Sequence, residues 1–200
     1  MPLPDHLKPV VEAVLRAPRN LPEPWVASGT QAVGGLTDVG FIPGTDFLLV
    51  LSSHGRGIYD CLTGQRVARD RDGDYPFDTA SLTAPAFADF TGHTVHTAGI
   101  HGGGLALTTH DGWSIDDFMF DWPEPIVTLS PAGLSWEYAT MGRPTVIYRL
   151  PADSTTRAFG FSPTGRSIVL ASSSDLQMIS RALLPPPNQQ VRQDASSNGG

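Results

Sequence analysis

The sequence predicts an all-β protein made of several similar sheets, preceded by one short helix. Two observations predict this fold class. The good helix formers Lys and Glu total only five residues, whereas the turn-favouring residues Asp, Gly and Pro number 16, 21 and 18. Short apolar runs also recur along the chain at steps of 34 to 46 residues. Many turns between short apolar runs are typical of many short strands.

The first 20 residues differ from the rest of the chain and predict the helix. Five apolar residues follow the i, i+3, i+4, i+7, i+8 spacing of one helical face: Leu7, Val10, Val11, Val14 and Leu15. Asp5 stands where it could cap the start, and Pro18 ends the helix. We expect residues 1–20 to form an amphipathic helix that packs on the main domain, in preference to a detachable helix that binds a partner.

Two later stretches align residue by residue. Residues 39–53 read VGFIPGTDFLLVLSS, and residues 159–173 read FGFSPTGRSIVLASS. Each predicts a strand, a turn containing Pro and Gly, a buried aliphatic strand and a Ser-Ser exit. Residues 85–98 and 126–139 are looser copies of the same strand–turn–strand unit. Equivalent points in the four units, at Phe41, Phe87, Val127 and Phe161, are 46, 40 and 34 residues apart, which is the range of propeller blades of four strands.

Residues 54–69 extend the first unit. They read HGRGIYDCLTGQRVAR and predict a strand ending in Tyr-Asp, a Leu-Thr-Gly turn and another strand. This segment resembles the hairpin of the third and fourth strands in WD40-like β-propellers, and residues 161–166 resemble the first hairpin of that family. The Trp-Asp dipeptide of the family is absent, and the Gly92-His93 pair falls in a hairpin turn. The resemblance implies that residues 21–184 form small propeller-like blades, four in number.

The last unit lacks a strand. It supplies strands near 158–162, 167–172 and 176–183, and then reaches Leu184-Pro-Pro-Pro, which cannot extend a sheet. The β-compatible run Trp25–Val33 could fill the fourth place and so close the ring. If it does not, the open alternatives are a half-propeller that dimerises and a β-sandwich. Residues 185–200, rich in Pro, Gln, Ser and Gly, predict a disordered tail.

The net charge of −7 is unevenly placed. Residues 70–124 hold ten acidic side chains against a single basic one, Arg71. A nucleic acid would be repelled from this region, so we expect a protein partner, and one with a basic surface fits best. Cys61 is the only cysteine, and neither a basic leader nor a long apolar run is visible. These features predict a cytoplasmic protein without a membrane span.

Four aspartates in the acidic segment suggest a calcium loop. Asp70, Asp72, Asp74 and Asp78 occupy positions 1, 3, 5 and 9 of a turn, a spacing that can bring carboxylates together on one ion. The loop departs from the EF-hand pattern, with Tyr where that pattern has its Gly and Ser in place of its last Glu. A solvated acidic turn explains the segment better, and we expect no cofactor other than calcium.

A second cluster holds histidines. Four of the six histidines fall within 18 residues: His93, His96, His101 and His110. On a strand over residues 94–100, His93 and His101 would share a face while His96 points away, so three ligands do not converge. A role as polar residues at the ends of strands explains these histidines better than a role as zinc ligands does.

These patterns favour a non-catalytic binding or scaffold module over an enzyme. Loop residues would make the contacts with a protein partner, and the candidates are His54, Arg56, His101, His110, Asp111 and Trp113. The alternative is a small metal-assisted hydrolase that uses the His93–His110 region, with Asp89 or Asp111 beside the histidines.

Overall fold

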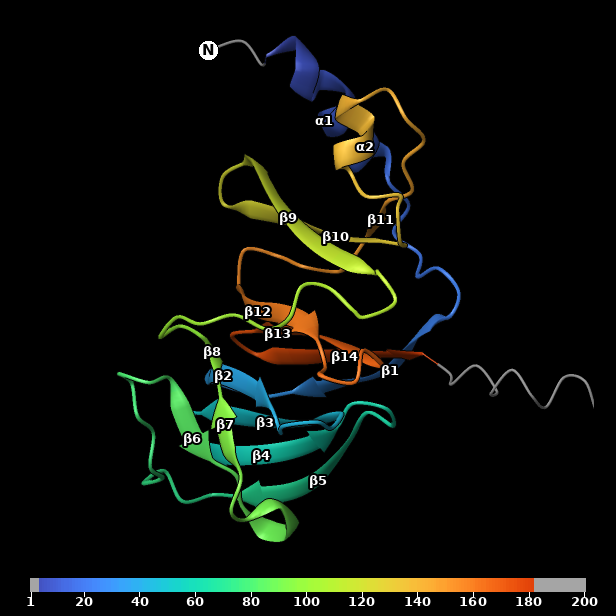
Figure 1. Ribbon diagram of the computed structural model, residues 1–200. Coiled ribbons are helices and arrows are strands. Elements are labelled where there is room, and N and C mark those ends of the chain that lie inside the picture. The colour runs from blue at the N-terminus through green and yellow to red at the C-terminus, as the bar shows by residue number, and fades with distance from the viewer. Residues whose placement is uncertain (1–3, 182–200) are drawn as a thin grey trace, which may run out of the picture.

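A computed structural model describes residues 4–181, and strands predominate in it (Figure 1). Strands hold 45% of the residues and helices 11%, which confirms the all-β class. The helical elements are η1 (Asp5–Leu7), α1 (Lys8–Arg16), η2 (Ala88–Phe90) and α2 (Glu137–Thr140). The strands are β1 (Trp25–Ala32), β2 (Leu36–Phe41), β3 (Phe47–Ser52), β4 (Gly55–Asp60), β5 (Gln65–Asp70), β6 (Thr83–Pro85), β7 (Thr94–His96), β8 (Ala98–Gly99), β9 (Ser114–Asp121), β10 (Glu124–Ser130), β11 (Tyr148–Arg149), β12 (Thr156–Phe161), β13 (Ser167–Ser172) and β14 (Asp175–Arg181).

The beginning of the domain pairs with its end. β1 lies antiparallel to β14 and completes a four-stranded sheet of order β1-β14-β13-β12, as predicted for the Trp25 segment. β13 is buried on both faces because its neighbouring side chains enter different cores: Val169 faces one cluster and Leu170 the other. This double burial explains why the segment reads as a continuous apolar run. Residues 182–184, and the tail predicted for 185–200, lie outside the described residues.

The first repeat forms the second large sheet. Its order is β5-β4-β3-β2-β8, and its three hairpins follow the turns predicted from residues 39–69. The hydrophobic core between the two large sheets contains Val39, Tyr59, Val169 and Met178. The two sheets therefore bury their faces against each other.

The two looser repeats agree with the prediction to different degrees. Residues 126–139 do not form a hairpin: β10 pairs with the earlier strand β9 and with β11, and residues 137–140 become helix α2. With β10 already paired on both edges, the following segment is free to fold as a helical turn whose neighbour Trp136 packs edge-on against Phe118. Around residues 85–98 a hairpin does form, since β6 pairs antiparallel with β7, but Pro85 ends β6 and η2 occupies the connection.

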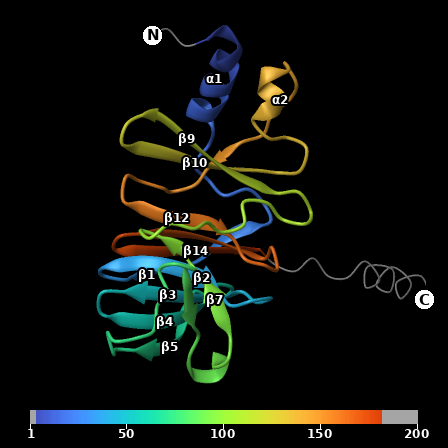
Figure 2. The same cartoon turned by 60° about the vertical axis from the view of Figure 1, so that its left-hand side comes forward.

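The sheets follow one another along the molecule, with β9 and β10 above β12–β14 and the β2–β5 sheet below (Figures 1 and 2). The β9–β11 sheet covers one side of the β1/β12–β14 sheet, the β2–β5 sheet covers the other, and β6 and β7 cover the far face of β2–β5. A closed ring is not found within residues 4–181, so the number of blades stays a prediction.

A buried carboxylate joins the two large sheets. Asp46, in the β2–β3 turn, is 6% exposed and accepts hydrogen bonds from three hydroxyls of the last repeat: Ser162 at 2.7 Å, Thr164 at 2.8 Å and Ser167 at 2.8 Å. Buried polar groups need such partners. The contact therefore fixes the two repeats relative to each other.

The N-terminal helix packs on the β9–β11 side of the molecule. Val10 and Val14 are buried with Ile147, whereas Leu15 is 52% exposed, so the apolar face is narrower than predicted. Asp5 lies in η1 and caps nothing with its side chain; Leu7 stands at the N-cap of α1. Among the described residues, no helix combines the length and the apolar character needed to cross a bilayer.

Candidate functional site

The candidate site is a pocket formed by arginines of β5, and an irregularity in that strand brings them together. The register with β4 shifts between Tyr59↔Arg66 and Ile58↔Ala68, so Val67 is an extra residue without a cross-strand partner. Cross-strand partners share a face of the sheet. Arg66 is therefore on the Tyr59 face, and Arg69, opposite Gly57, is on the same face. Regular alternation would have put two residues three positions apart on opposite faces.

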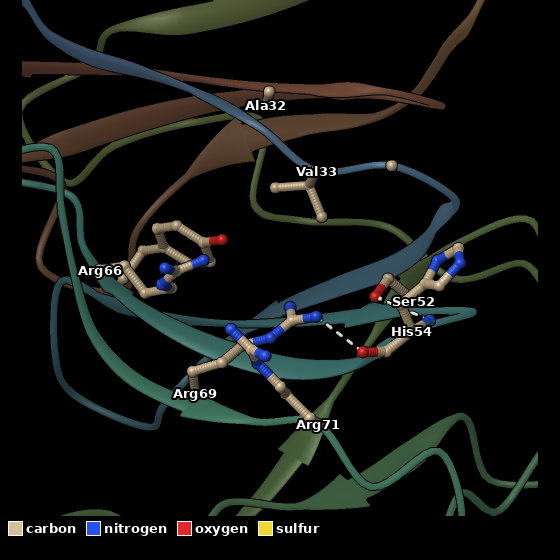
Figure 3. Close-up of a pocket in the computed structure, with 9 residues that line it drawn as sticks. Ala32, Val33, Ser52, His54, Arg66, Arg69 and Arg71 are labelled. Atoms are coloured by element: carbon tan, nitrogen blue, oxygen red, sulfur yellow. Dashed lines mark hydrogen bonds between the residues drawn. The ribbon is translucent and has the colours of Figure 1, made fainter.

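The pocket is a cavity of about 360 Å³ over this face (Figure 3). Its lining residues come from the end of β1 and the link to β2, from the β3–β4 turn, and from β4 and β5 with the residue after it: Ala32, Val33, Gly34, Ser52, His54, Tyr59, Arg66, Arg69 and Arg71. Gly57 keeps this face open, because a Cβ there would lie 3.1 Å from the Tyr59 ring and 3.6 Å from Arg66 Cδ. The cavity thus lies between the end of β1, which is the edge strand of one large sheet, and the β4–β5 part of the other large sheet.

The pocket is positively charged. None of the described residues that line it carries a carboxylate, and within residues 4–181 none of its three arginines has a carboxylate oxygen within 4.0 Å. Arg69 donates a hydrogen bond of 2.6 Å to the backbone carbonyl of His54. The side chains of Arg66 and Arg71 make no hydrogen bond to any described residue, and both are exposed. Guanidinium groups present forked N–H donors that match carboxylate and phosphate oxygens, so this arrangement can bind an anion.

Arg56, a predicted contact residue, lies on the other face of the same hairpin. Its Nε is 3.0 Å from Asp70 Oδ2, it donates to the Pro85 carbonyl at 2.9 Å, and its guanidinium stacks over the rings of Tyr75 and Phe87. The backbone N–H of Asp72 and the Arg56 guanidinium lower the pKa of Asp70. Arg56 therefore tethers the 71–87 loop to the sheet. Of the predicted contact residues, only His54 lines the arginine pocket.

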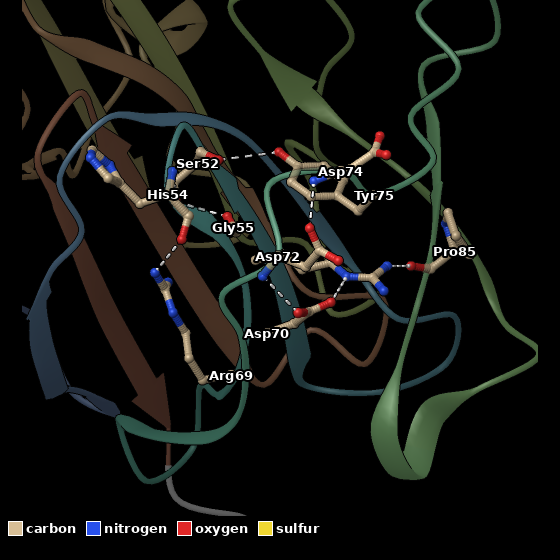
Figure 4. Close-up of polar contacts among 10 residues, drawn as sticks. Ser52, His54, Gly55, Arg69, Asp70, Asp72, Asp74, Tyr75 and Pro85 are labelled. Carbon is tan, nitrogen blue, oxygen red and sulfur yellow. Dashed lines mark hydrogen bonds and ion pairs between the residues drawn. The ribbon is translucent and has the colours of Figure 1, made fainter.

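The acidic segment that follows folds as a series of turns (Figure 4). Asp70, Asp72 and Asp78 each accept a backbone N–H from two residues further on, at 2.9, 3.1 and 2.8 Å. The Ser81 hydroxyl and the backbone N–H groups of Ala80 and Ser81 lower the pKa of Asp78. Asp74 is exposed. No three His, Cys, Asp or Glu side chains within residues 4–181 are grouped closely enough to hold a metal ion. Calcium binding by this loop stays a prediction from the sequence.

The histidines between His93 and His110 take part in no group of three possible metal ligands in the part of the chain that the structure describes. The Nδ1 atom of His101 lies 2.7 Å from Oδ2 of the fully buried Asp38, and the His101 ring packs edge-on against Phe77. His93, His96 and His110 are exposed. His101 therefore serves as the partner of a buried carboxylate.

Asp111 and Trp113 contribute to a different contact. Arg181 binds Asp111 through two hydrogen bonds of 2.5 and 2.9 Å and lies over the ring of Trp25, against which Trp113 packs edge-on. The hydrogen bonds from Arg181 lower the pKa of Asp111 to about 2. This group holds the 105–113 loop against the β1–β14 pair.

Reasoning from the sequence missed the pocket arginines. All three lie in the run QRVARDR over residues 65–71, and this density of arginines is the one feature of the sequence that points to the pocket. Strict alternation along a strand would put the side chains of Arg66 and Arg69 on opposite faces of the sheet. Nothing in the residue types marks Val67 as an extra residue.

Comparison with known proteins adds no family assignment. The chain matches no protein-family model, and no curated protein is significantly similar to it.

Proposed function

We propose that this chain is a non-catalytic binding module that engages a protein partner, and that the arginine pocket anchors an acidic group of that partner. The observation that carries the proposal is the convergence of Arg66, Arg69 and Arg71 on one cavity without a carboxylate among its described lining residues. Arginines left without an internal acidic partner are available to an external anion. The net charge of the chain predicts a partner with a basic surface. The arginine pocket instead supports a partner that presents an acidic group.

The proposal includes the propeller-like arrangement. The sheets β2–β5 and β1/β12–β14 would be neighbouring blades, and the pocket would lie at the junction between them. The matching turns of the two repeats and the Asp46 contact support this arrangement. A half-propeller that dimerises stays the alternative, and sedimentation of the purified chain would distinguish a monomer from a dimer.

Two observations favour binding over catalysis. Two of the side chains offered for a metal-assisted hydrolase are engaged elsewhere, since His101 bonds Asp38 and Asp111 bonds Arg181. Burial raises the pKa of the Cys61 thiol well above its ordinary value, so this thiol is unsuited to act as a nucleophile. We keep a cytoplasmic location in the proposal because Cys61 is the only cysteine. The hydrolase alternative would gain support from stoichiometric zinc in the purified protein.

The test is binding of acidic peptides. Fluorescent peptides with randomised flanks and a fixed central pair of glutamates should bind more tightly than the same peptides with a glutamine pair. The double variant R66Q/R69Q should lose this preference. R143Q, which changes an exposed arginine outside the pocket, is the matched control and should retain it. Equal affinity for both peptide sets in the unmodified protein would refute the proposal.

A further inference from the structure

We infer that the preferred anion of the arginine pocket is a phosphoryl group, carried by a phosphorylated side chain of the protein partner. The inference rests on the proposed function and narrows it from an acidic group to a phosphoryl group.

The charge of the pocket favours a dianion. Three guanidinium groups line one cavity of about 360 Å³, with His54 at its edge and no carboxylate among the described lining residues. A glutamate or aspartate of the partner would bring one negative charge and leave most of this charge uncompensated. A phosphorylated side chain brings about −1.5 to −2 at neutral pH. Its charge is thus a better match for three cations that repel one another.

The number of donors also favours a phosphoryl group. One side-chain N–H of Arg69 is committed to the His54 carbonyl, whereas the side chains of Arg66 and Arg71 have no hydrogen bond to any described residue. The pocket therefore offers forked donors from three side chains, all based on β5 and the residue after it. A phosphoryl group has three terminal oxygens that can accept them, and a carboxylate has two.

The surroundings of the pocket favour a single phosphoryl group over a nucleic acid. Asp72 and Asp74 closely follow Arg71 and are exposed, and residues 70–124 carry ten acidic side chains. A polyanion would have to run past these carboxylates, which would repel its other phosphates. A peptide with one phosphorylated residue places charge only in the pocket.

The experiment compares three peptide libraries with randomised flanks and a fixed central phosphoserine, glutamate or serine, by fluorescence anisotropy. We expect the phosphoserine library to bind at least about tenfold more tightly than the glutamate library, a difference of about 1.4 kcal/mol. R66Q, R69Q and R71Q should each weaken phosphoserine binding by about fivefold or more, as expected for loss of a charge-assisted hydrogen bond. R143Q should leave it unchanged. Thermal melting of each variant shows whether the fold is retained, and R66K, which keeps the charge but not the fork, should weaken binding less than R66Q does.

The results of this experiment distinguish failure of the phosphoryl inference from failure of the proposed function. Equal binding of the phosphoserine and glutamate libraries would overturn the inference and leave the proposed function intact. Failure of both libraries, or equal effects of R66Q and R143Q, would overturn both. Inorganic phosphate that binds as tightly as the phosphoserine library would show that a small phosphate is the ligand and would overturn the assignment to a protein side chain.

Discussion

The hydroxyl of Ser167 donates a 2.8 Å hydrogen bond to the carboxylate of Asp46, although 121 positions separate the two residues. Ser167 is fully buried and begins β13, while Asp46 ends the β2–β3 turn. The bond joins the two repeats at equivalent turns. A carboxylate is suited to this place because it accepts several hydroxyl donors at once.

Replacing Asp46 should therefore destabilise the whole domain. D46A leaves Ser162, Thr164 and Ser167 without their common acceptor, and we expect a loss of about 3 kcal/mol in the free energy of unfolding. D46N, which keeps the shape and one acceptor oxygen, should lose less. Urea denaturation measures both, with D89N in an exposed position as the control. A D46A loss as small as that of D89N would contradict the role assigned to Asp46 at this junction.

Trp25 should be the residue on which the pairing of β1 with β14 depends. Its ring is 2% exposed, packs against Trp113 and Phe161, and lies beneath Arg181. W25A should cost about 3 to 5 kcal/mol. V26A, at a neighbouring position that is 58% exposed, should cost less than about 0.5 kcal/mol. Hydrogen exchange should show the loss of protection in W25A along β1 and β14 first; unchanged protection there would refute the assigned role.

Two glycines with the same φ allow the cost of backbone strain to be measured separately from the cost of steric crowding. Gly44 and Gly64 both have φ of +72°, but a Cβ at Gly44 would meet nothing within 4 Å, whereas one at Gly64 would lie 2.3 Å from the Ser28 carbonyl oxygen. G44A should cost about 1 kcal/mol for the left-handed conformation. G64A should cost at least about 2 kcal/mol more, because β1 must move away from the β4–β5 turn. Similar melting temperatures for the two variants would show that β1 does not approach this turn closely.

The Asp111–Arg181 pair should make stability depend on pH in acid. The pKa of Asp111 is lowered to about 2 in the folded protein, so the pair stabilises the fold above the unfolded pKa and this contribution disappears as the pH falls towards 2. The side chain of Asp111 is 52% exposed, which limits the contribution to less than about 1 kcal/mol. The difference in unfolding free energy between the unmodified protein and D111N should shrink between about pH 5 and pH 2. A constant difference over this range would contradict the pair's assigned role.

Much of the fold could be predicted from local chemistry. The aliphatic run before Ser172 and the turn residues around Pro163 specify the hairpins of the last repeat, and the missing fourth strand indicates the Trp25 segment, which does pair with β14. Residues 134–140 could not be assigned in this way. Their local pattern suits a strand, but β10 is already paired with β9 on one edge and with β11 on the other, and this tertiary context overrides local preference.

The site could be predicted only in part. His54 is one of the predicted contact residues, and it does line the pocket. Arg56 was identified by residue type, but the face it occupies follows from its pairing with Asp70. Arg66 and Arg69 share a face because Val67 is an extra residue in β5, and the position of such a bulge depends on the partner strand rather than on the residue types.

Anion binding by the arginine pocket can be measured without knowing the partner, by titrating inorganic phosphate and following the side-chain Nε–Hε signals of the arginines by NMR. We expect the signals of Arg66, Arg69 and Arg71 to shift together with one dissociation constant, while those of Arg143 and Arg157 stay in place. If the three pocket signals do not move, or if Arg143 moves with the same dissociation constant, the pocket is not an anion site and both proposals are wrong.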